Sequence, residues 1–420
     1  MQIHQQALRE VQGSLFSSAF RKPLYTSWNF ARIPATISYL LTGEERELAL
    51  PSSSYIEGDY DLVVLLFLDA LGFVFLKEFY DHPFVRSITK RGVLSPITVQ
   101  FPSTTSAHVT TIHTGIEVGQ TGIYEWFQYE PLVDEIIAPL LFSRAHDTIQ
   151  HSLLSSSHLP TAFFPFRTFY EKLHEKEVES YVLQEVSISD SPYSQALCKG
   201  AHRLAYKSLK QGLQTMRELI ETKGDKKRYL FLYHSAIDAT GHRKGIRSSH
   251  FAQSIKTCLD LLEEELLPFL PKKAALLATA DHGMVPVRPK KMLFVNELCS
   301  DLDTYIARNH RQAPLAPAGS CRDLFLHIKP AYLEEAYHKL SLLLQGQAEV
   351  WKVQDLIAMG FFGEHPVSLR FCERVGNLVI LPYVGKGVFW REPHHAASHF
   401  LAAHGGLSPE EMESFFAFIS

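Results

Sequence analysis

The chain has little cysteine, and its cysteines form no motif. Five of them are scattered over 420 residues, and no two stand as Cys-x-x-Cys. An odd and widely spread set fits neither a disulfide framework nor a thiolate metal site. We therefore expect reduced and mostly structural thiols at the five positions, which are Cys198, Cys258, Cys299, Cys321 and Cys372.

An excess of positive charge is also absent. The 41 basic and 45 acidic residues give a formal net charge of -4. This balance excludes the broad cationic surface that holds bulk nucleic acid or an anionic membrane. A small phosphate ester, such as a nucleotide, remains compatible with it. The sequence carries no signal for an oligomeric state.

No apolar run is long enough for a membrane span. The most apolar stretch, from Leu62 to Leu76, is shorter than the roughly 17 residues that a spanning helix needs, and Asp69 lies within it. The N-terminus shows neither the continuous apolar stretch nor the small-residue cleavage site of a secretory signal. We therefore expect a cytoplasmic protein. We expect Leu62 to Leu76 to form a buried strand that runs into a helix.

Three apolar runs do occur, and each ends at metal-binding residue types. DLVVLLFLDALG ends at Asp69, RYLFLYHSAIDATGH at Asp238 and His242, and AALLATADHGM at Asp281 and His282. Near-continuous apolar runs are typical of central strands in a sheet that helices cover on both faces. Ligand sites in such sheets collect at the carboxyl ends of the strands, so we expect the three polar clusters on one rim.

The segments around these strands predict an α/β fold with a mostly parallel central sheet. Helical periodicity at 194–221 and 248–267 completes a sandwich of helix, sheet and helix. We expect residues 1–60 to wrap the core, with ARIPATISYLLTG as a helix, and residues 61–293 to form the first part of the main domain.

The pattern changes after the third apolar run. Residues 294–372 read as strand, helix, strand and short helix, which predicts a small inserted α+β cap. We expect residues 373–420 to complete the main domain, with NLVILPYV returning to the main sheet.

The polar residues at the strand ends form a candidate metal-ligand set. Asp238-x-x-x-His242, the adjacent Asp281 and His282, and Asp69 combine hard oxygen with borderline nitrogen donors. That mixture favours zinc, with manganese or iron as alternatives. Each cluster alone could be a polar loop or turn, but their shared position at strand ends favours a metal site.

A hydroxyl nucleophile is available in the segment TVQFPSTTSAHVTTIHTG. Two metal ions about 4 Å apart can stabilise the attacking and the leaving oxygens of an in-line displacement. Thr105 precedes a predicted helix, whose free N-terminal amides suit a phosphate. The alternative is a Ser/Thr-rich cap on an ordinary helix.

Together these motifs resemble those of the type I phosphodiesterase/nucleotide pyrophosphatase family, within the alkaline phosphatase superfamily. The family's first-strand Asp is similar to Asp69, and its Phe-Pro-Thr-x-Thr motif followed by Thr-Gly is similar to FPSTTSAHVTTIHTG. This match places the nucleophile at Thr105, or at Thr104 if the loop is offset. The other motifs of the family resemble Asp238 with His242, Asp281 to Met284, and His404 in HGGLSPEEM.

The resemblance implies an alkaline-phosphatase-like fold with two divalent ions, preferably Zn²⁺. Asp69, Thr105, Asp281 and His282 would surround one ion, and Asp238, His242 and His404 the other. His394, His395 and His399 could compete with His404, but the Gly-Gly and helix start that follow favour His404. Where the family has Asn three residues after the nucleophile, this chain has His108, which could donate a hydrogen bond to a phosphoryl oxygen.

The implied function is hydrolysis of a small phosphate ester through a phosphothreonine intermediate, as in a phosphodiesterase or nucleotide pyrophosphatase. No arginine near the motifs is available for the extra charge of a monoester, so a diester is the better substrate. Phosphomonoesterase or phosphotransferase activity at the same site is the alternative. A metal-stabilised binding protein without catalysis is the rival from another class.

Overall fold

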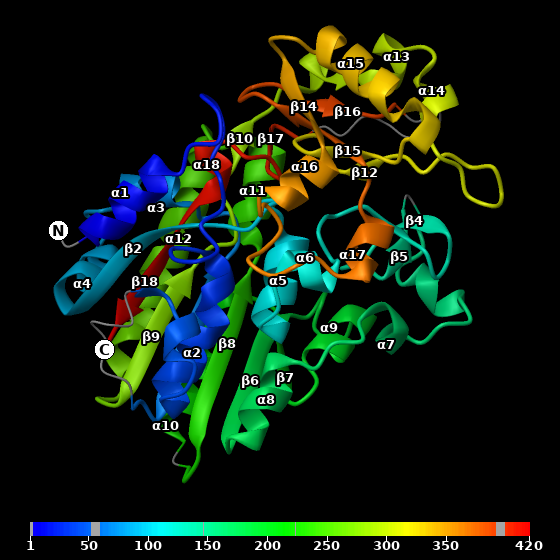
Figure 1. The fold of residues 1–420 in the computed structure, drawn as a ribbon. Coiled ribbons are helices and arrows are strands. Elements are labelled where there is room, and N and C mark those ends of the chain that lie inside the picture. Colours follow the sequence, from blue (N-terminus) through cyan, green and yellow to red (C-terminus); the bar gives the residue numbers. More distant parts are fainter. Residues whose placement is uncertain (1–2, 52–58, 146, 223, 392–399) are drawn as a thin grey trace.

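A seven-stranded sheet forms the centre of the molecule (Figure 1). The structure is a computed structural model and describes residues 3–51, 59–145, 147–222, 224–391 and 400–420. The strand order is β2-β18-β9-β1-β8-β6-β7. The bounds of these strands are Leu62–Leu68 for β1, Gly92–Thr98 for β2, Val178–Glu185 for β6, His202–Tyr206 for β7, Lys227–His234 for β8, Ala274–Thr279 for β9 and Glu413–Ile419 for β18.

The sheet is mostly parallel, as predicted. Strand β1 pairs in parallel with β8 and β9, and β6 pairs in parallel with β7 and β8. Strand β18 runs antiparallel to both of its neighbours, β2 and β9. The three predicted apolar runs are therefore adjacent central strands, and their carboxyl ends share one edge.

Helices cover both faces of the sheet. Alternate residues of β1 pack into two different buried clusters, with Val63 and Leu65 in one and Val64 and Leu66 in the other. The first cluster includes residues from α2 (Ile33–Thr42), α5 (Thr105–Thr114) and α8 (Phe169–Glu175). The second includes residues from α3 (Phe73–Glu78), α4 (Pro83–Arg91), α10 (Leu209–Glu221) and α12 (Ser249–Glu265). This two-sided burial confirms the predicted sandwich.

One predicted helical stretch is wrong in its middle. Residues 194–221 contain the end of α9 (Pro192–Leu197), the strand β7 and then α10. Strand β7 lies at the edge of the sheet, and its His202 and Arg203 are exposed. It lacks the continuous apolar run of a central strand, so its sequence does not stand out from the helices around it.

The segment after the third apolar run has its own four-stranded sheet, in the order β12-β13-β15-β14. The bounds are Ala318–Gly319 for β12, Leu324–Leu326 for β13, Ala348–Lys352 for β14 and Leu378–Pro382 for β15, with helices α15 (Leu333–Leu343) and α16 (Val353–Ala358). The predicted return of NLVILPYV to the main sheet is wrong, because β15 pairs antiparallel with β13 and β14. All five residues of β15 are buried, so its apolar run looks the same as that of a central strand.

A short antiparallel ladder joins two distant parts of the chain near the rim of the main sheet. Strand β10 (Val285–Pro286) pairs with β17 (Ala402–Ala403). Strand β10 begins three residues after His282, and β17 ends directly before His404. This pairing brings two of the predicted metal ligands together, although more than a hundred residues separate them in sequence.

The N-terminal segment lies along the β2 side of the sheet. Ile3 and Asn29 form isolated bridges with Leu94 and Thr98 of β2. Helix α1 (Gln5–Gly13) follows the first bridge, and α2 coincides with the predicted ARIPATISYLLTG helix. Buried residues of both helices belong to the same cluster as Val63 and Leu65 of β1, so this described part of the segment packs against the core.

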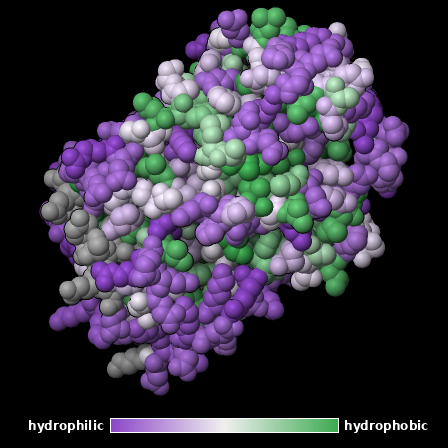
Figure 2. All heavy atoms as spheres, in the orientation of Figure 1, coloured by the Kyte–Doolittle hydropathy of each residue, from purple (hydrophilic) through white to green (hydrophobic). Residues whose placement is uncertain are grey.

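Hydrophilic and apolar residues are unevenly distributed over the surface. Hydrophilic residues cover most of the face shown in Figure 2, and apolar residues gather near its middle. Within the described residues, no helix combines the length and apolar character needed to cross a membrane. All five cysteines are free thiols, as expected from their spacing.

Candidate active site

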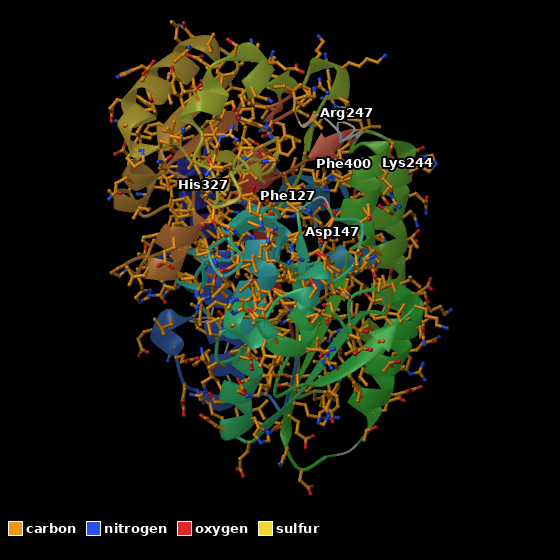
Figure 3. The ribbon with its side chains drawn as sticks, turned by 90° about the vertical axis from the view of Figure 1, so that its right-hand side faces the viewer. Phe127, Asp147, Lys244, Arg247, His327 and Phe400 are labelled. Carbon is orange, nitrogen blue, oxygen red and sulfur yellow. The ribbon has the colours of Figure 1, made fainter. Side chains whose placement is uncertain are left out.

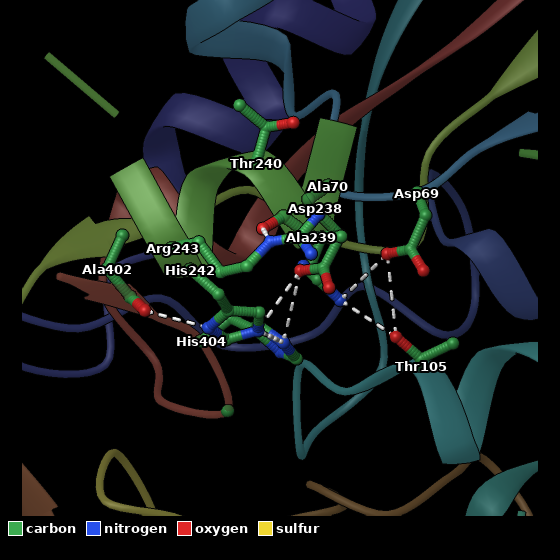
Figure 4. A network of polar contacts seen from close by, with 12 residues as sticks. Asp69, Ala70, Thr105, Asp238, Ala239, Thr240, His242, Arg243, Ala402 and His404 are labelled. Atoms are coloured by element: carbon green, nitrogen blue, oxygen red, sulfur yellow. Dashed lines mark hydrogen bonds and ion pairs between the residues drawn. The ribbon is translucent and has the colours of Figure 1, made fainter. Parts of the chain in front are cut away.

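Three neighbouring strands deliver carboxylates to one edge of the sheet. Asp69 directly follows β1, and Asp281 follows β9 by two residues. Asp238 lies in the first turn of α11 (Ala236–Lys244), which begins just after β8. Because these strands are parallel neighbours, residues that are far apart in sequence meet at their carboxyl ends (Figure 4).

Asp69, Asp281 and His282 form a first ligand group. One candidate ligand atom from each lies within 4.8 Å of the others, and all three residues are buried. Nε2 of His282 lies 3.5 Å from Oδ1 of Asp69 and 3.3 Å from Oδ2 of Asp281. Oδ1 of Asp281 accepts hydrogen bonds from the backbone amides of Ala70 and His282, each at 3.1 Å. One carboxylate oxygen is thus fixed by the backbone, and the other is directed at the group.

Asp238, His242 and His404 form a second ligand group, within the same 4.8 Å limit. Oδ1 of Asp238 lies 3.2 Å from Nε2 of His242 and 3.6 Å from Nε2 of His404. The two groups adjoin, because the His282 and His404 rings stack with centroids 3.6 Å apart. The geometry therefore brings together all six of the Asp and His ligands that the sequence predicted.

Backbone carbonyls orient all three histidine rings. Nδ1 of His242 lies 2.8 Å from the carbonyl oxygen of Ala402, and Nδ1 of His404 lies 3.0 Å from that of Ser103. Nδ1 of His282 lies 3.1 Å from the carbonyl oxygen of Gly283. A proton on each Nδ1 satisfies these carbonyls and leaves a lone pair on each Nε2. This is the arrangement in which neighbouring groups orient a metal-binding histidine.

The donor atoms fit divalent cations. Oδ1 of Asp238 and Oδ2 of Asp281 are buried and accept no hydrogen bond from the part of the chain that the structure describes. Nε2 of His242 and Nε2 of His404 face each other at 3.2 Å. Facing lone pairs and unpaired carboxylate oxygens repel one another, and a cation between them would remove that repulsion.

The electrostatics of the site point the same way. Burial raises the pKa of Asp69 well above its ordinary range, and the charges of Asp281 and Asp238 raise it further. Burial lowers the pKa of His404 to about 3, and the charge of His282 acts in the same direction. Burial therefore disfavours a bare charge on Asp69 and a proton on His404. Against the cost of burial, the charge of Asp281 raises the pKa of His282, and the charges of neighbouring histidines lower the pKa of Asp238 and Asp281. Bound cations would balance these carboxylates without added protons.

Thr105 places its hydroxyl at the first ligand group. It is the first residue of α5, and its Oγ1 lies 3.2 Å from Nε2 of His282 and 3.5 Å from Oδ1 of Asp69. The first backbone amides of a helix have no partner within it, so those of α5 are available to an anion here. Thr104 is the N-cap residue, and its side chain interacts with Glu125. Of the two threonines considered, Thr105 is the one that contacts a ligand group.

His108 does not fit the predicted contact with a phosphoryl oxygen. Its Nδ1 lies 2.6 Å from the carbonyl oxygen of Thr104, and its Nε2 accepts a hydrogen bond from the amide of Gln100 at 2.9 Å. Burial lowers its pKa to about 4, so the ring is neutral at pH 7. Because both ring nitrogens are engaged by the backbone, His108 holds the loop before α5 and has no N–H group left for a substrate.

Tyr233, which the sequence pattern did not single out, also supports the site. The Tyr233 hydroxyl donates a hydrogen bond to Oδ2 of Asp69, although Tyr233 looked like an ordinary residue of an apolar strand. The one available signal was its pairing, since Tyr233 is opposite Phe67 on β1, two residues before Asp69.

His394, His395 and His399, which were considered as rivals of His404, lie outside the described residues.

The comparison with protein families decides the affiliation. The model of the type I phosphodiesterase/nucleotide pyrophosphatase family matches residues 63–406, which is most of the chain. The chain belongs to this family. It is therefore a phosphoester hydrolase of the alkaline phosphatase superfamily, as the motifs predicted.

Solved structures of similar proteins show the same fold. Murine ectonucleotide pyrophosphatase/phosphodiesterase 5 matches with a TM-score of 0.61 and 16% identity, over 84% of this chain and 87% of that chain. Phosphonoacetate hydrolase from Sinorhizobium meliloti 1021 matches with a TM-score of 0.60 and 16% identity, over 84% and 89%. An inactive variant of the murine protein has been solved in complex with AMP. No curated protein matches the chain in sequence.

Proposed function

We propose that this protein is a zinc-dependent phosphodiesterase that acts through a phosphothreonine intermediate on Thr105. The observation that carries the proposal is the Thr105 hydroxyl, which lies within 3.5 Å of two members of the first ligand group while the second group adjoins it. Asp69, Asp281 and His282, with Thr105, would hold one ion, and Asp238, His242 and His404 would hold the other. The mixed oxygen and nitrogen donors favour Zn²⁺.

Bound at these positions, two dications would supply Lewis-acid stabilisation of the attacking and leaving oxygens and would lower the pKa of water. The chain itself supplies the nucleophile. Oγ1 of Thr105 gives its proton to solvent and forms a bond to phosphorus, and the bond from phosphorus to the ester's leaving oxygen breaks, so that the leaving group departs as an alcohol with a proton from solvent. Water then attacks the phosphothreonine from the opposite side, which releases phosphate or a phosphomonoester and restores the Thr105 hydroxyl.

The amino end of α5 has a separate task. The backbone amides of Thr105, Ser106 and Ala107 occupy the first turn of that helix and have no intrahelical acceptor. Aimed at a phosphoryl group on Thr105, they would stabilise its non-bridging oxygens. The nucleophile and these amides would thus act on the same phosphoryl group.

Charge around the site favours a diester over a monoester. Among the described residues, no lysine or arginine forms an ion pair with a carboxylate of either ligand group. Buried Glu125 interacts with Thr104, and buried Asp323 lies beside Glu125. A monoester carries one negative charge more than a diester. The acidic side chains around the ligand groups do not stabilise that additional charge, as a nearby lysine or arginine would.

Residues on the outer side of the second ligand group support a nucleotide as the substrate. Phe400 is 46% exposed, and its ring centroid lies 4.4 Å from that of His242. In Figure 3, Phe400 is on the same side of the molecule as Lys244 and Arg247, which follow His242 in the chain. An aromatic ring can stack with a base, and nearby cations suit a second phosphate. The AMP complex of the murine protein supports this substrate class.

Turnover of bis-p-nitrophenyl phosphate tests the proposal. With zinc present, Thr105→Ala should lower kcat on the order of 10⁴-fold, because a nucleophile is lost. The matched variant Thr104→Ala should keep the intermediate, visible as a p-nitrophenyl phosphoryl group on the peptide that contains Thr105 after an acid quench. Zinc binding without turnover of any mono- or diester would instead support a binding protein. In the wild type, a p-nitrophenyl phosphoryl group on Thr104 would refute the assignment of the nucleophile.

A further inference from the structure

Ser103 joins the loop that carries the nucleophile to the loop that carries His404. It lies two residues before Thr105 and is fully buried. Its hydroxyl donates a hydrogen bond to the carbonyl oxygen of Gly406 at 2.7 Å and accepts one from the amide of Gly405 at 3.1 Å. Both hydrogen-bonding functions of this hydroxyl are thus used on one loop.

The backbone of Ser103 adds two more hydrogen bonds to the same loop. Its amide donates to the carbonyl oxygen of Gly405 at 3.2 Å, and its carbonyl oxygen accepts from Nδ1 of His404 at 3.0 Å. A single residue therefore binds three consecutive residues that are about three hundred positions away in the chain. The first of these three is a predicted metal ligand.

The opposite side of the His404 loop is packed closely against the segment that holds Asp323. A Cβ atom on Gly405 would lie 2.4 Å from Oδ1 of Asp323, and Gly405 has a φ of +127°, which L side chains rarely adopt. On the same side, the Ser320 hydroxyl donates to the carbonyl oxygen of His404 at 3.1 Å. The loop is therefore held between these groups and Ser103, and the Ser103 contacts decide its position relative to the nucleophile.

From this geometry we propose that Ser103 is a positioning residue, which sets the distance between the Thr105 hydroxyl and the second ligand group. The proposal rests on the proposed function and deepens it. The backbone carbonyl of Ser103 directs Nε2 of His404 at Asp238 and His242, and the Ser103 hydroxyl fixes the two residues that follow His404. Loss of the hydroxyl would loosen this loop, so the hydroxyl controls how tightly the second group binds its ion. In the described chain no hydrogen bond joins Ser103 to a member of the first ligand group. The link to that group is the stacking of the His404 ring on that of His282, so loss of the Ser103 hydroxyl should leave the ion of the first group nearly unaffected.

Zinc titration of the metal-free, full-length protein tests this inference without any substrate. We expect two sites in the wild type. Ser103→Ala, which removes the hydroxyl, and Ser103→Cys, which keeps the volume with a weaker donor, should each weaken one site by about 10- to 100-fold and leave the other unchanged. Ser103→Thr retains the hydroxyl and should bind both ions within a few-fold of the wild type.

The control variant is Ser95→Ala. Ser95 is also fully buried, but it lies in β2, and its hydroxyl has no hydrogen-bond partner in the described chain. Its loss should change neither zinc site. Under saturating zinc, kcat of Ser103→Ala should still be lower by about 10-fold or more, with KM nearly unchanged. The reason is that the distance between the Thr105 hydroxyl and the second ligand group is no longer fixed.

Three outcomes would overturn the inference. One is unchanged zinc affinity in both Ser103→Ala and Ser103→Cys, and another is equal weakening of both sites, which indicates general loosening. The third is a Ser103→Thr variant as weak as Ser103→Ala, because packing and not the hydroxyl would then matter. Absence of diester turnover in the wild type would count against the proposed function alone, since the zinc affinities are measured without substrate.

Discussion

Replacing Arg322 by alanine should destabilise the protein strongly. Arg322 and Glu411 form an ion pair in which neither side chain is exposed. Nε and Nη2 of Arg322 donate to the two carboxylate oxygens of Glu411, each at 2.9 Å. Nη1 donates to the carbonyl oxygens of Tyr383 at 3.0 Å and Lys386 at 2.7 Å. In Arg322→Ala these acceptors lose the guanidinium, and Glu411 keeps a buried charge for which the backbone amides of Gly406 and Ser408 remain as donors.

The expected loss in the free energy of unfolding is about 3–5 kcal/mol, because one partner of a buried pair is left uncompensated. The exposed pair of Arg86 and Asp81 is the matched control, and Arg86→Ala should cost only about 0.2–1 kcal/mol. Urea unfolding at pH 7, with the midpoint and slope compared between variants, measures both. The double variant Arg322→Met/Glu411→Met should recover much of the loss, since it buries no charge.

A loss below about 1 kcal/mol in Arg322→Ala would refute this reasoning. It would mean that water reaches Glu411 in the variant, or that the carboxyl takes up a proton at little cost. Equal destabilisation by the single and the double variant would also contradict it, because volume and not charge would then decide. Since Oε1 of Glu411 accepts a hydrogen bond from the amide of Gly406 in the His404 loop, Arg322→Ala should in addition weaken zinc binding at the second ligand group.

Three further predictions concern the ligand groups and the core. Tyr233→Phe removes the hydrogen bond to Asp69 and should weaken zinc at the first ligand group about 10-fold, with the second group unchanged in the same titration. Chelation with EDTA should lower the melting temperature, because ions at 100 times their Kd add about 2.7 kcal/mol to the folded state, and zinc should restore it; an unchanged melting curve would count against bound ions. Burial lowers the pKa of His113 to about 3, so the folded state binds fewer protons than the unfolded state below pH 6.5. Stability should therefore fall by about 1.4 kcal/mol per pH unit from this group as pH drops from 6.5 toward 3, and urea midpoints of His113→Gln should show a correspondingly shallower pH dependence.

The central strands of the main sheet were predictable because a strand that is buried on both faces consists almost entirely of apolar residues. Strand β1 is buried along its whole length, and β9 is as well, so each appears as a continuous apolar run. The same rule misled at β15, which is equally buried but belongs to a different sheet. It failed at β7, an edge strand with exposed residues. The pattern of apolar residues along a strand predicts how deeply the strand is buried. It does not predict which sheet the strand belongs to.

Like the fold, the site was predictable only in part from the sequence. Asp69, Asp238 and Asp281 follow from strand ends, whereas His404 required the family resemblance. Ser103 and Tyr233 were missed because their partners lie far along the chain, and neither residue type is unusual in its place. His108 was misjudged because spacing alone does not reveal that the backbone already engages both of its ring nitrogens.

The insertion of β18 between β2 and β9 has a consequence for synthesis on the ribosome. Both neighbours precede it in the chain, and β9 is complete by Thr279, while β18 begins at Glu413. At ordinary translation rates the growing chain spends on the order of 10 s with the facing edges of β2 and β9 unpaired. Such open edges invite pairing with other nascent chains, so chaperone protection during that interval would raise the yield of folded protein.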